Sequence, residues 1–473
     1  MQTHPIDPIY DSNSKILILG SFPSVISRQE CFYYAHPQNR FFKVISSILN
    51  VCEPQSNEDK KKMLLSNNIA LWDVIGACNI TGSQDSSITD VVANDIGALL
   101  DKTNIGAIYC NGTTAYNLYN KYIKKKIMHR INANAVLLPS TSPANAAFSL
   151  ADLINSWGRI KTALKRRDFN APYYSLSEYA YDLDDMPDKL YRLSLDGGFT
   201  CPNRDGTLSD KGCIFCSAGG SGDFAADKNL PISKQLLEQK KLIGGKLPKT
   251  KSVGYIAYFQ ANTGTYDAIE RLRKLYMQAI DEDDVCILSI ATRPDCLSKE
   301  VLELLGEMNK IKPVWVELGL QTVSKKSAEY INRQYELGVY KSAVTNLKKI
   351  GITQIVTHVI LGLPRESKKN MLQTIKCAID CGSNALKLSM LHILNNTAIA
   401  DDYRQGKFSL MSLDEYKELL CDIFKTLPPD VVVHRFTGDG NKRDLIAPLW
   451  AADKKRVLNT INKAAWDMAK LPS

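Results

Sequence analysis

The second half of the sequence alternates regularly between short apolar segments and amphipathic stretches, and no other feature restricts its possible folds as strongly. Apolar segments of strand length lie at 192–195, 253–259, 285–290, 314–318, 354–361 and 385–390. Helix-period stretches separate them, and strands that alternate with helices pair in parallel. This succession predicts an α/β fold with a partial (β/α)6 barrel over residues 173–394 and a C-terminal extension over 395–473.

The first part of the sequence alternates with a different rhythm. Strands are predicted at 15–19, 107–110 and 135–138, and helices at 38–50 and 148–164. This pattern favours an α/β/α sandwich with a central parallel sheet over residues 1–164. Residues 165–172 combine charged side chains with Asn and Pro, which is typical of a linker between two domains.

Composition places the chain among ordinary globular proteins. Of its 473 residues, 44% are hydrophobic and 23% are charged, which excludes a mainly disordered or collagen-like chain. We expect neither a membrane-spanning helix nor a secretory signal, because the sequence has no apolar run of about 18 residues and no basic start before an apolar stretch. The predicted location is therefore cytoplasmic. The formal net charge of +9 is compatible with a polyanionic partner.

Three of the twelve cysteines form a cluster with the pattern Cys-x11-Cys-x2-Cys at Cys201, Cys213 and Cys216. The cluster follows the first strand of the predicted barrel, and sites in parallel α/β folds gather at the carboxyl ends of strands. A structural zinc ion prefers four ligands, and no Cys or His lies between residues 217 and 285. Three thiolates suit an iron–sulfur cluster with one open iron. Zinc stays an alternative, since a carboxylate or a distant side chain can act as fourth ligand.

The residues around these cysteines resemble a known superfamily. The segment 195–207, Leu-Asp-Gly-Gly-Phe-Thr-Cys-Pro-Asn-Arg-Asp-Gly-Thr, together with 212–216, Gly-Cys-Ile-Phe-Cys, is similar to the radical S-adenosylmethionine (SAM) enzymes of the YhcC-type branch. The resemblance covers about residues 172–473. It implies a 4Fe–4S cluster on the three cysteines, reductive cleavage of SAM at the open iron, and hydrogen abstraction from a substrate that the sequence does not identify. It also implies reduced flavodoxin or ferredoxin as electron donor.

Other polar residues match this superfamily by their place in the predicted barrel. The resemblance implies that the cofactor SAM is contacted by Gln260, Asn262, Gln321 and His358. Polar side chains at a barrel rim can equally face water, and His358 can be a hydrogen-bonded core histidine.

Three polar or aromatic segments stand out in the first part of the chain. They are 20–24 (Gly-Ser-Phe-Pro-Ser), 33–42 (Tyr-Tyr-Ala-His-Pro-Gln-Asn-Arg-Phe-Phe) and 138–145 (Leu-Pro-Ser-Thr-Ser-Pro-Ala-Asn). Loops of this kind at strand ends can stack a planar ring on aromatic side chains and bind its edge with amides. Core packing is the alternative for the aromatic residues, and we favour it for Phe41 and Phe42. The alternative for Asn39 is a helix N-cap.

These segments resemble the uracil-DNA glycosylase superfamily, best its family-six branch, the hypoxanthine-DNA (deoxyinosine) glycosylases. The similarity covers about residues 10–163 and includes 71–74, 82–86, 111–112 and 140–145. It implies excision of hypoxanthine from DNA by hydrolysis of the N-glycosidic bond.

The resemblance also implies roles for single residues. It assigns a catalytic role to Asn39, Ser142 and Asn145. It assigns substrate binding to Gly20, Ser21, Tyr34 and Ser140. Asn39 would position water, since residues 21–24 offer no carboxylate, and Tyr34 would stack on the flipped base. Ser142 would hold a phosphate or sugar. Ala144 and Asn145 occupy the place of a bulky wedge, although Ala144 is small. DNA would be the partner. The excess positive charge of this part of the chain predicts phosphate contacts, with Arg28, Arg40 and Lys43 beside the pocket loop as candidates, although these side chains can equally be solvated surface.

Taken together, the two resemblances predict a bifunctional protein, a base-excision DNA glycosylase joined to a radical SAM enzyme. Two other functions stay open. The first domain can be a non-catalytic module that delivers a nucleic acid to the radical enzyme, or it can be a uracil-DNA glycosylase. The sequence does not indicate the oligomeric state.

Overall fold

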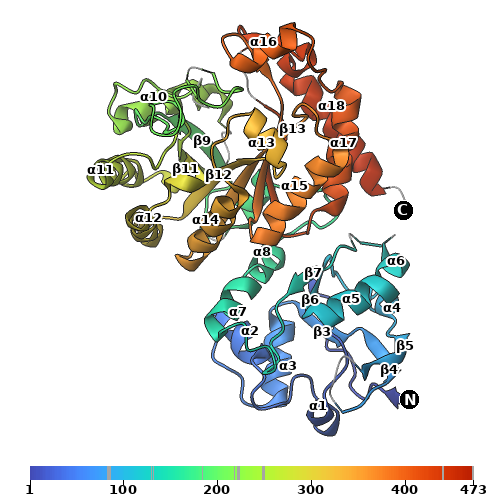
Figure 1. The fold of residues 1–473 in the computed structure, drawn as a ribbon. Coiled ribbons are helices and arrows are strands. Elements are labelled where there is room, and N and C mark those ends of the chain that lie inside the picture. The colour runs from blue at the N-terminus through green and yellow to red at the C-terminus, as the bar shows by residue number, and fades with distance from the viewer. Residues whose placement is uncertain are drawn as a thin grey trace. The chain divides into compact units, whose positions relative to one another are not determined.

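The computed structural model describes residues 1–82, 87–128, 130–131, 133–183, 185–217, 219–220, 224–247, 251–438 and 442–470. The chain forms two compact units (Figure 1). The first comprises residues 1–173 with 425–430 and 466–473, and the second comprises 174–424 and 431–465. Among the described residues, no helix has the length and apolar character that crossing a membrane requires.

A four-stranded parallel sheet forms the centre of the first unit. Its order is β3 (Ile69–Asp73), β2 (Ile16–Gly20), β6 (Ala107–Asn111) and β7 (Val136–Leu138). The three strands expected from the sequence are present, and β3 is an addition. Alternate residues of β2 enter opposite cores, Ile16 and Ile18 on one face and Leu17 and Leu19 on the other. Helices cover both faces, so the predicted three-layer α/β/α arrangement is confirmed.

The helix expected at 148–164 is two helices. They are α7 (Leu150–Trp157) and α8 (Ile160–Lys165), with Gly158 as the C-cap of α7. Glycine has a low helix propensity, which explains the interruption. The other expected helix is α2 (Phe41–Leu49).

The remaining elements of the first unit are short. Strands β1 (Gln2–Thr3), β4 (Ile75–Asn79) and β5 (Thr89–Ala93) form an antiparallel sheet. The other helices are α1 (Val25–Gln29), α3 (Asn57–Ser66), α4 (Ile96–Leu100), α5 (Thr113–Tyr122) and α6 (Lys124–Ile127).

The second unit contains a curled, half-barrel sheet of eight parallel strands. Its order is β8 (Tyr174–Ser175), β16 (Val432–Arg435), β14 (Ala385–Met390), β13 (Gln354–Leu361), β12 (Val314–Gln321), β11 (Val285–Thr292), β10 (Val253–Phe259) and β9 (Lys189–Leu195). The six strands predicted from the sequence are those from β9 to β14. Strands β16 and β8 extend the sheet beyond the expected six. They were missed because they are too short for a recognisable period-2 pattern.

Helices surround this sheet on the outside (Figure 1). The helices between its strands are α10 (Ile232–Ile243), α11 (Ile269–Ile280), α12 (Lys299–Ile311), α13 (Lys325–Tyr330), α14 (Leu337–Lys349) and α15 (Lys368–Cys381). Helix α9 (Leu176–Asp182) precedes β9. The C-terminal extension contributes α16 (Ala398–Arg404), α17 (Leu413–Thr426), α18 (Lys454–Lys470) and an antiparallel pair, β15 (Ile393–Leu394) with β17 (Leu445–Ala447).

Candidate functional sites

The three clustered cysteines lie in the loop that follows β9, and the eleven residues between the first two fold back on themselves. The Leu208 amide donates to the Pro202 carbonyl at 2.7 Å, and the Gly212 amide donates to the Asn203 carbonyl at 2.6 Å. The fully buried Asn203 donates from Nδ2 to the Asn332 carbonyl at 2.7 Å and to Cys213 Sγ at 3.4 Å. The long spacer is therefore an ordered return that is anchored to the segment after α13.

The cysteine thiols have unequal electrostatic surroundings. A hydrogen bond with Cys216 lowers the pKa of Cys213 to about 7, and Arg293 and Arg204 act in the same direction against the effect of burial. The same hydrogen bond, together with burial, raises the pKa of Cys216. Arg204 also donates from Nη2 to the carbonyl of Cys216 at 3.2 Å. Cationic side chains of this kind favour the thiolate form that metal binding requires.

A buried carboxylate organises the interior of the half-barrel. Glu317 on β12 accepts hydrogen bonds from Arg192 at 2.7 Å, Lys387 at 2.8 Å, His358 at 2.7 Å and Tyr258 at 2.8 Å. Burial by itself raises the pKa of Glu317, but Arg192 and Lys387 hold it well below the usual value. Burial lowers the pKa of Lys387 to about 7 and that of His358 to about 4. We call these five residues the Glu317 network.

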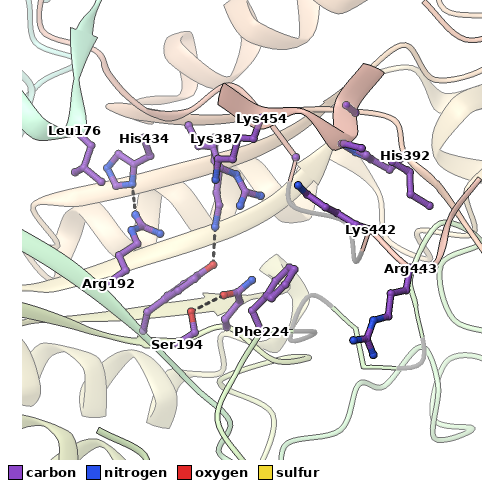
Figure 2. Close-up of a pocket in the computed structure, with 17 residues that line it drawn as sticks. Leu176, Arg192, Ser194, Phe224, Lys387, His392, His434, Lys442, Arg443 and Lys454 are labelled. Atoms are coloured by element: carbon purple, nitrogen blue, oxygen red, sulfur yellow. Dashed lines mark hydrogen bonds between the residues drawn. The ribbon is translucent and has the colours of Figure 1, made fainter. Parts of the chain in front are cut away.

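A cavity of about 690 Å³ adjoins the Glu317 network (Figure 2). Figure 2 shows Arg192 and Lys387 on one side of it and Lys442 and Arg443 on the other. Gln260, at the end of β10, also lines the cavity, and its Oε1 accepts a hydrogen bond from Ser194 at 3.0 Å. The volume falls within the range of small-molecule sites.

In the first unit, Asn39 connects two of the segments that the sequence singled out. Its Oδ1 accepts from the Phe41 amide at 2.9 Å, at the start of α2, and from Thr141 Oγ1 at 3.2 Å. The buried Thr141 also exchanges two hydrogen bonds with Asn111, at 2.9 and 3.0 Å. Among the described residues, Nδ2 of Asn39 has no hydrogen-bond partner, so this N–H group remains as a donor for a ligand.

The aromatic residues of the segment 33–42 belong partly to the hydrophobic core and partly to the candidate site. Phe41 and Phe42 are buried, as expected, and Tyr33 joins the same core. Tyr34 is only partly buried, and its ring stacks on that of Phe41 with centroids 4.2 Å apart. One face of Tyr34 is thus supported by a buried ring.

Arg40 holds the loop that contains residues 140–148. Its Nη2 donates to the carbonyls of Ser142 at 2.8 Å and Asn145 at 2.9 Å, and its Nη1 donates to the carbonyl of Phe148 at 2.6 Å. Three backbone carbonyls therefore hold this guanidinium in place, and its predicted contact with a phosphate stays a prediction. Arg28 similarly donates to the Pro23 carbonyl at 2.7 Å.

Comparison with known proteins agrees with this geometry. Residues 8–161 match the family model of the uracil DNA glycosylase superfamily. Residues 201–378 match the radical SAM superfamily, and residues 383–466 match the radical SAM C-terminal domain. This chain belongs to both superfamilies, one in each part.

This chain aligns with most of the length of three relatives. The uncharacterised protein YtqA of Bacillus subtilis is 43% identical over 58% of this chain and 84% of its own. Protein YhcC of Escherichia coli is 34% identical over 56% of this chain and 84% of its own, which confirms the expected branch. The hypoxanthine DNA glycosylase of Methanosarcina acetivorans is 35% identical over 30% of this chain and 87% of its own.

Membership of the radical SAM superfamily implies a 4Fe–4S cluster and SAM, which decides against the zinc alternative. The donor set fits: three thiols lie in one loop beside Arg204 and Arg293. Among the described residues, no three His, Cys, Asp or Glu side chains are placed to bind one metal ion. A four-iron cluster has no such requirement, because each cysteine binds a different iron.

The predicted SAM contacts of the radical SAM domain lie in different surroundings. Gln260 lines the cavity, and His358 belongs to the Glu317 network. Asn262 donates to the carbonyl of Phe199, in the cysteine loop, at 3.1 Å. Gln321 is the last residue of β12, and both Asn262 and Gln321 have a positive φ. The structure thus brings Gln260 and His358 to the barrel interior and Asn262 to the cysteine loop.

In the glycosylase-family domain, the predicted residues of the last loop also bond to one another. Asn145 donates from Nδ2 to the Ser140 carbonyl at 2.8 Å, and the Ser140 hydroxyl accepts from the Ser142 amide at 3.2 Å. Ala144 is exposed. Residues 83–86 of the predicted segment 82–86 lie outside the described part of the chain.

The structure also identifies a carboxylate beside the first loop. A Cβ atom on Gly20 would overlap the carboxylate of Asp73 and approach Tyr34 Oη to 3.2 Å. The buried Asp73, on β3, shares a hydrogen bond of 2.8 Å with the ring of His4. Gly20 and Ser21, predicted to bind substrate, therefore adjoin a carboxylate that segment 21–24 lacks. Sequence reasoning missed this pairing because β3 was not recognised as the neighbour of β2.

Sequence reasoning also missed Thr141 and most of the Glu317 network. A signal existed for Glu317 and Lys387, since each is a single charged residue inside an apolar strand. Charged residues are almost never fully buried unless they are paired. No comparable local signal exists for Thr141, whose contacts come from distant loops.

Replacement of Glu317 by glutamine is expected to destabilise the second unit by about 3–5 kcal/mol, because it leaves Arg192 and Lys387 without their buried counter-charge. The measurement is urea unfolding of the full chain followed by circular dichroism. The matched control is Glu307→Gln, which removes an exposed partner of Arg273 and is expected to leave the unfolding midpoint unchanged. Equal midpoints for the two variants would contradict a structural role of the Glu317 network.

Proposed function

We propose that this protein is bifunctional: a DNA glycosylase that excises hypoxanthine, joined to a radical SAM enzyme. The observation that carries the glycosylase part is the fixed orientation of Asn39. Its Oδ1 is held by Phe41 and Thr141, so Nδ2 is the group available to a ligand. Identity of 35% with a hypoxanthine DNA glycosylase supports this substrate.

The proposed chemistry follows from the charge that develops when an N-glycosidic bond breaks. The sugar gains oxocarbenium character and the leaving base gains negative charge, which positioned donors stabilise. An amide does not accept a proton at neutral pH, so Asn39 would orient water or the base by donating from Nδ2. Tyr34, supported by Phe41, would stack on the flipped base. Ser142 and Asn145 would act from the loop that Arg40 holds.

The test is base excision by the full chain from duplexes that carry hypoxanthine, uracil or xanthine. Release of hypoxanthine in preference to the other bases supports the proposal. Preferred release of uracil would make the domain a uracil-DNA glycosylase. Binding of DNA without release of any base would make it a delivery module for the radical SAM domain.

We also infer that Phe148 is the wedge that fills the space of the flipped base. The expected wedge position contains the small Ala144, whereas the residue Phe148, on the same loop, is 36% exposed. Arg40 bonds the Phe148 carbonyl and so holds the loop on both sides of Ala144. Apolar side chains inserted between base steps compensate for the lost stacking.

Phe148→Ala is therefore expected to slow excision from duplex DNA roughly tenfold or more, since extrusion of a base from a duplex costs a few kcal/mol. Excision from single-stranded DNA should not change, because no stack has to be opened. The control is Val92→Ala, which removes an exposed apolar side chain from β5. A loss of equal size on both DNA forms would contradict the wedge assignment.

For the second part of the chain we propose that Cys201, Cys213 and Cys216 hold the cluster and that Gln260, Asn262, Gln321 and His358 contact SAM. When both groups are bound, the chemistry that they would supply at this site is the reductive cleavage of SAM. The chain's own residues orient this site: Asn203 and Arg204 bond the cysteine loop. Reduced flavodoxin or ferredoxin is the proposed electron donor. The proposed boundaries are 1–164, a linker at 165–172, a core at 173–394 and an extension at 395–473.

A further inference from the structure

The cavity beside the Glu317 network has a positively charged lining. Of the 17 described residues that line it, six are Lys or Arg and none is Asp or Glu. Two of the six, Arg192 and Lys387, contact the carboxylate of Glu317 behind the cavity wall. The other four come from the last part of the second unit. They are Arg435, Lys442, Arg443 and Lys454.

The lining is suited to a ligand that is partly apolar and carries negative charge. Leu176, Phe224 and Leu445 contribute apolar surface to the same cavity. Figure 2 shows Phe224 between the Arg192 side and the Lys442 side. A ligand that spans the cavity can therefore place a ring or an aliphatic part against apolar groups and an anionic end near Lys442 and Arg443.

SAM by itself does not account for this charge. Its sulfonium and ammonium groups outweigh its single carboxylate, so the molecule is cationic overall. Four cationic side chains beyond those bonded to Glu317 disfavour a cation and favour an anion of more than one charge. Phosphate groups have this charge, and arginine binds their oxygens in a bidentate manner.

We propose that this cavity binds a phosphorylated substrate of the radical SAM domain, with its phosphate group at Lys442 and Arg443. This inference rests on the proposed radical SAM activity and adds the chemical class of its substrate. The phosphate can belong to a free phosphorylated metabolite or to a nucleotide within a nucleic-acid strand. Both present the same oxyanion to these side chains.

The experiment uses the full chain with its cluster reconstituted anaerobically and SAM bound, and it measures radiolabelled pyrophosphate binding by equilibrium dialysis. The test variant is Lys442→Glu with Arg443→Glu. The control is Lys299→Glu with Lys325→Glu, which changes the charge equally at side chains that are 85% and 75% exposed on α12 and α13. We expect the test variant to bind pyrophosphate at least about tenfold more weakly and the control to bind it as the wild type does.

Two results would overturn the proposal: no pyrophosphate binding by the wild type at millimolar concentration, or equal losses in the two variants. Formation of 5′-deoxyadenosine without the probe is measured in parallel. Its absence in the wild type would contradict the proposed radical SAM activity, whatever the binding result. Competition then separates the two sources of the phosphate group. If the substrate is a free metabolite, a mononucleotide should displace pyrophosphate better than a single-stranded pentanucleotide does. If the substrate is a nucleic-acid strand, the pentanucleotide should displace pyrophosphate better.

Discussion

Replacement of Cys213 by alanine is expected to abolish binding of the iron–sulfur cluster, from about four irons per chain to close to none. The hydrogen bond with Cys216 lowers the pKa of Cys213 to about 7, which favours the thiolate form that binds iron. Cys213 also accepts the hydrogen bond from Asn203 that anchors the spacer. Two remaining thiols leave two irons without a protein ligand. The measurement is anaerobic reconstitution, iron and sulfide analysis, and detection of 5′-deoxyadenosine after reduction.

The matched control is Cys296→Ala. Burial raises the pKa of this nearby thiol to about 12, so it stays protonated, and we expect its loss to leave the iron content unchanged. Thermal unfolding of both variants checks that the cysteine loop is not lost with the side chain. A cluster that survives in Cys213→Ala, or stoichiometric zinc without iron in the wild type, would contradict the assignment of the three cysteines.

Asn39→Ala is expected to reduce the rate of hypoxanthine excision by about 10²–10³, the usual effect of removing one positioned polar group from a transition state. The substitution removes both the Oδ1 that Phe41 and Thr141 hold and the Nδ2 donor. The measurement is the single-turnover rate on a deoxyinosine duplex with the full chain in excess. Binding of the same duplex should change much less than the rate.

Two further variants separate positioning from chemistry. Thr141→Val keeps the side-chain volume but removes the hydroxyl that bonds Asn39 and Asn111, so an intermediate loss is expected. Asn39→Asp keeps the oxygen acceptor and removes the N–H donor. If Nδ2 is the active group, Asn39→Asp should lose as much rate as Asn39→Ala. Wild-type rates in Asn39→Ala would remove this residue from the mechanism.

Much of the fold was predictable because it depends on local patterns. The strands from β9 to β14 have six to eight residues each and β2 has five, which is long enough for a mainly apolar strand pattern to show in the sequence. The two strands at one end of the half-barrel sheet, β8 and β16, have two and four residues, and only their pairing defines them. The break between α7 and α8 was missed, because a glycine inside a helical pattern ends the helix in some proteins and is tolerated in others.

The candidate sites divide in the same way. The sequence by itself singled out the cysteine cluster as a candidate site, because its three thiols lie within 16 residues of one loop, and it singled out Asn39 as a candidate through the family resemblance of the motif around it. Tertiary structure alone decided the partners. Thr141 meets Asn39 across 102 positions, and Lys387 meets Glu317 across 70. Such contacts have no local pattern, because they depend on which loops and strands the fold brings together.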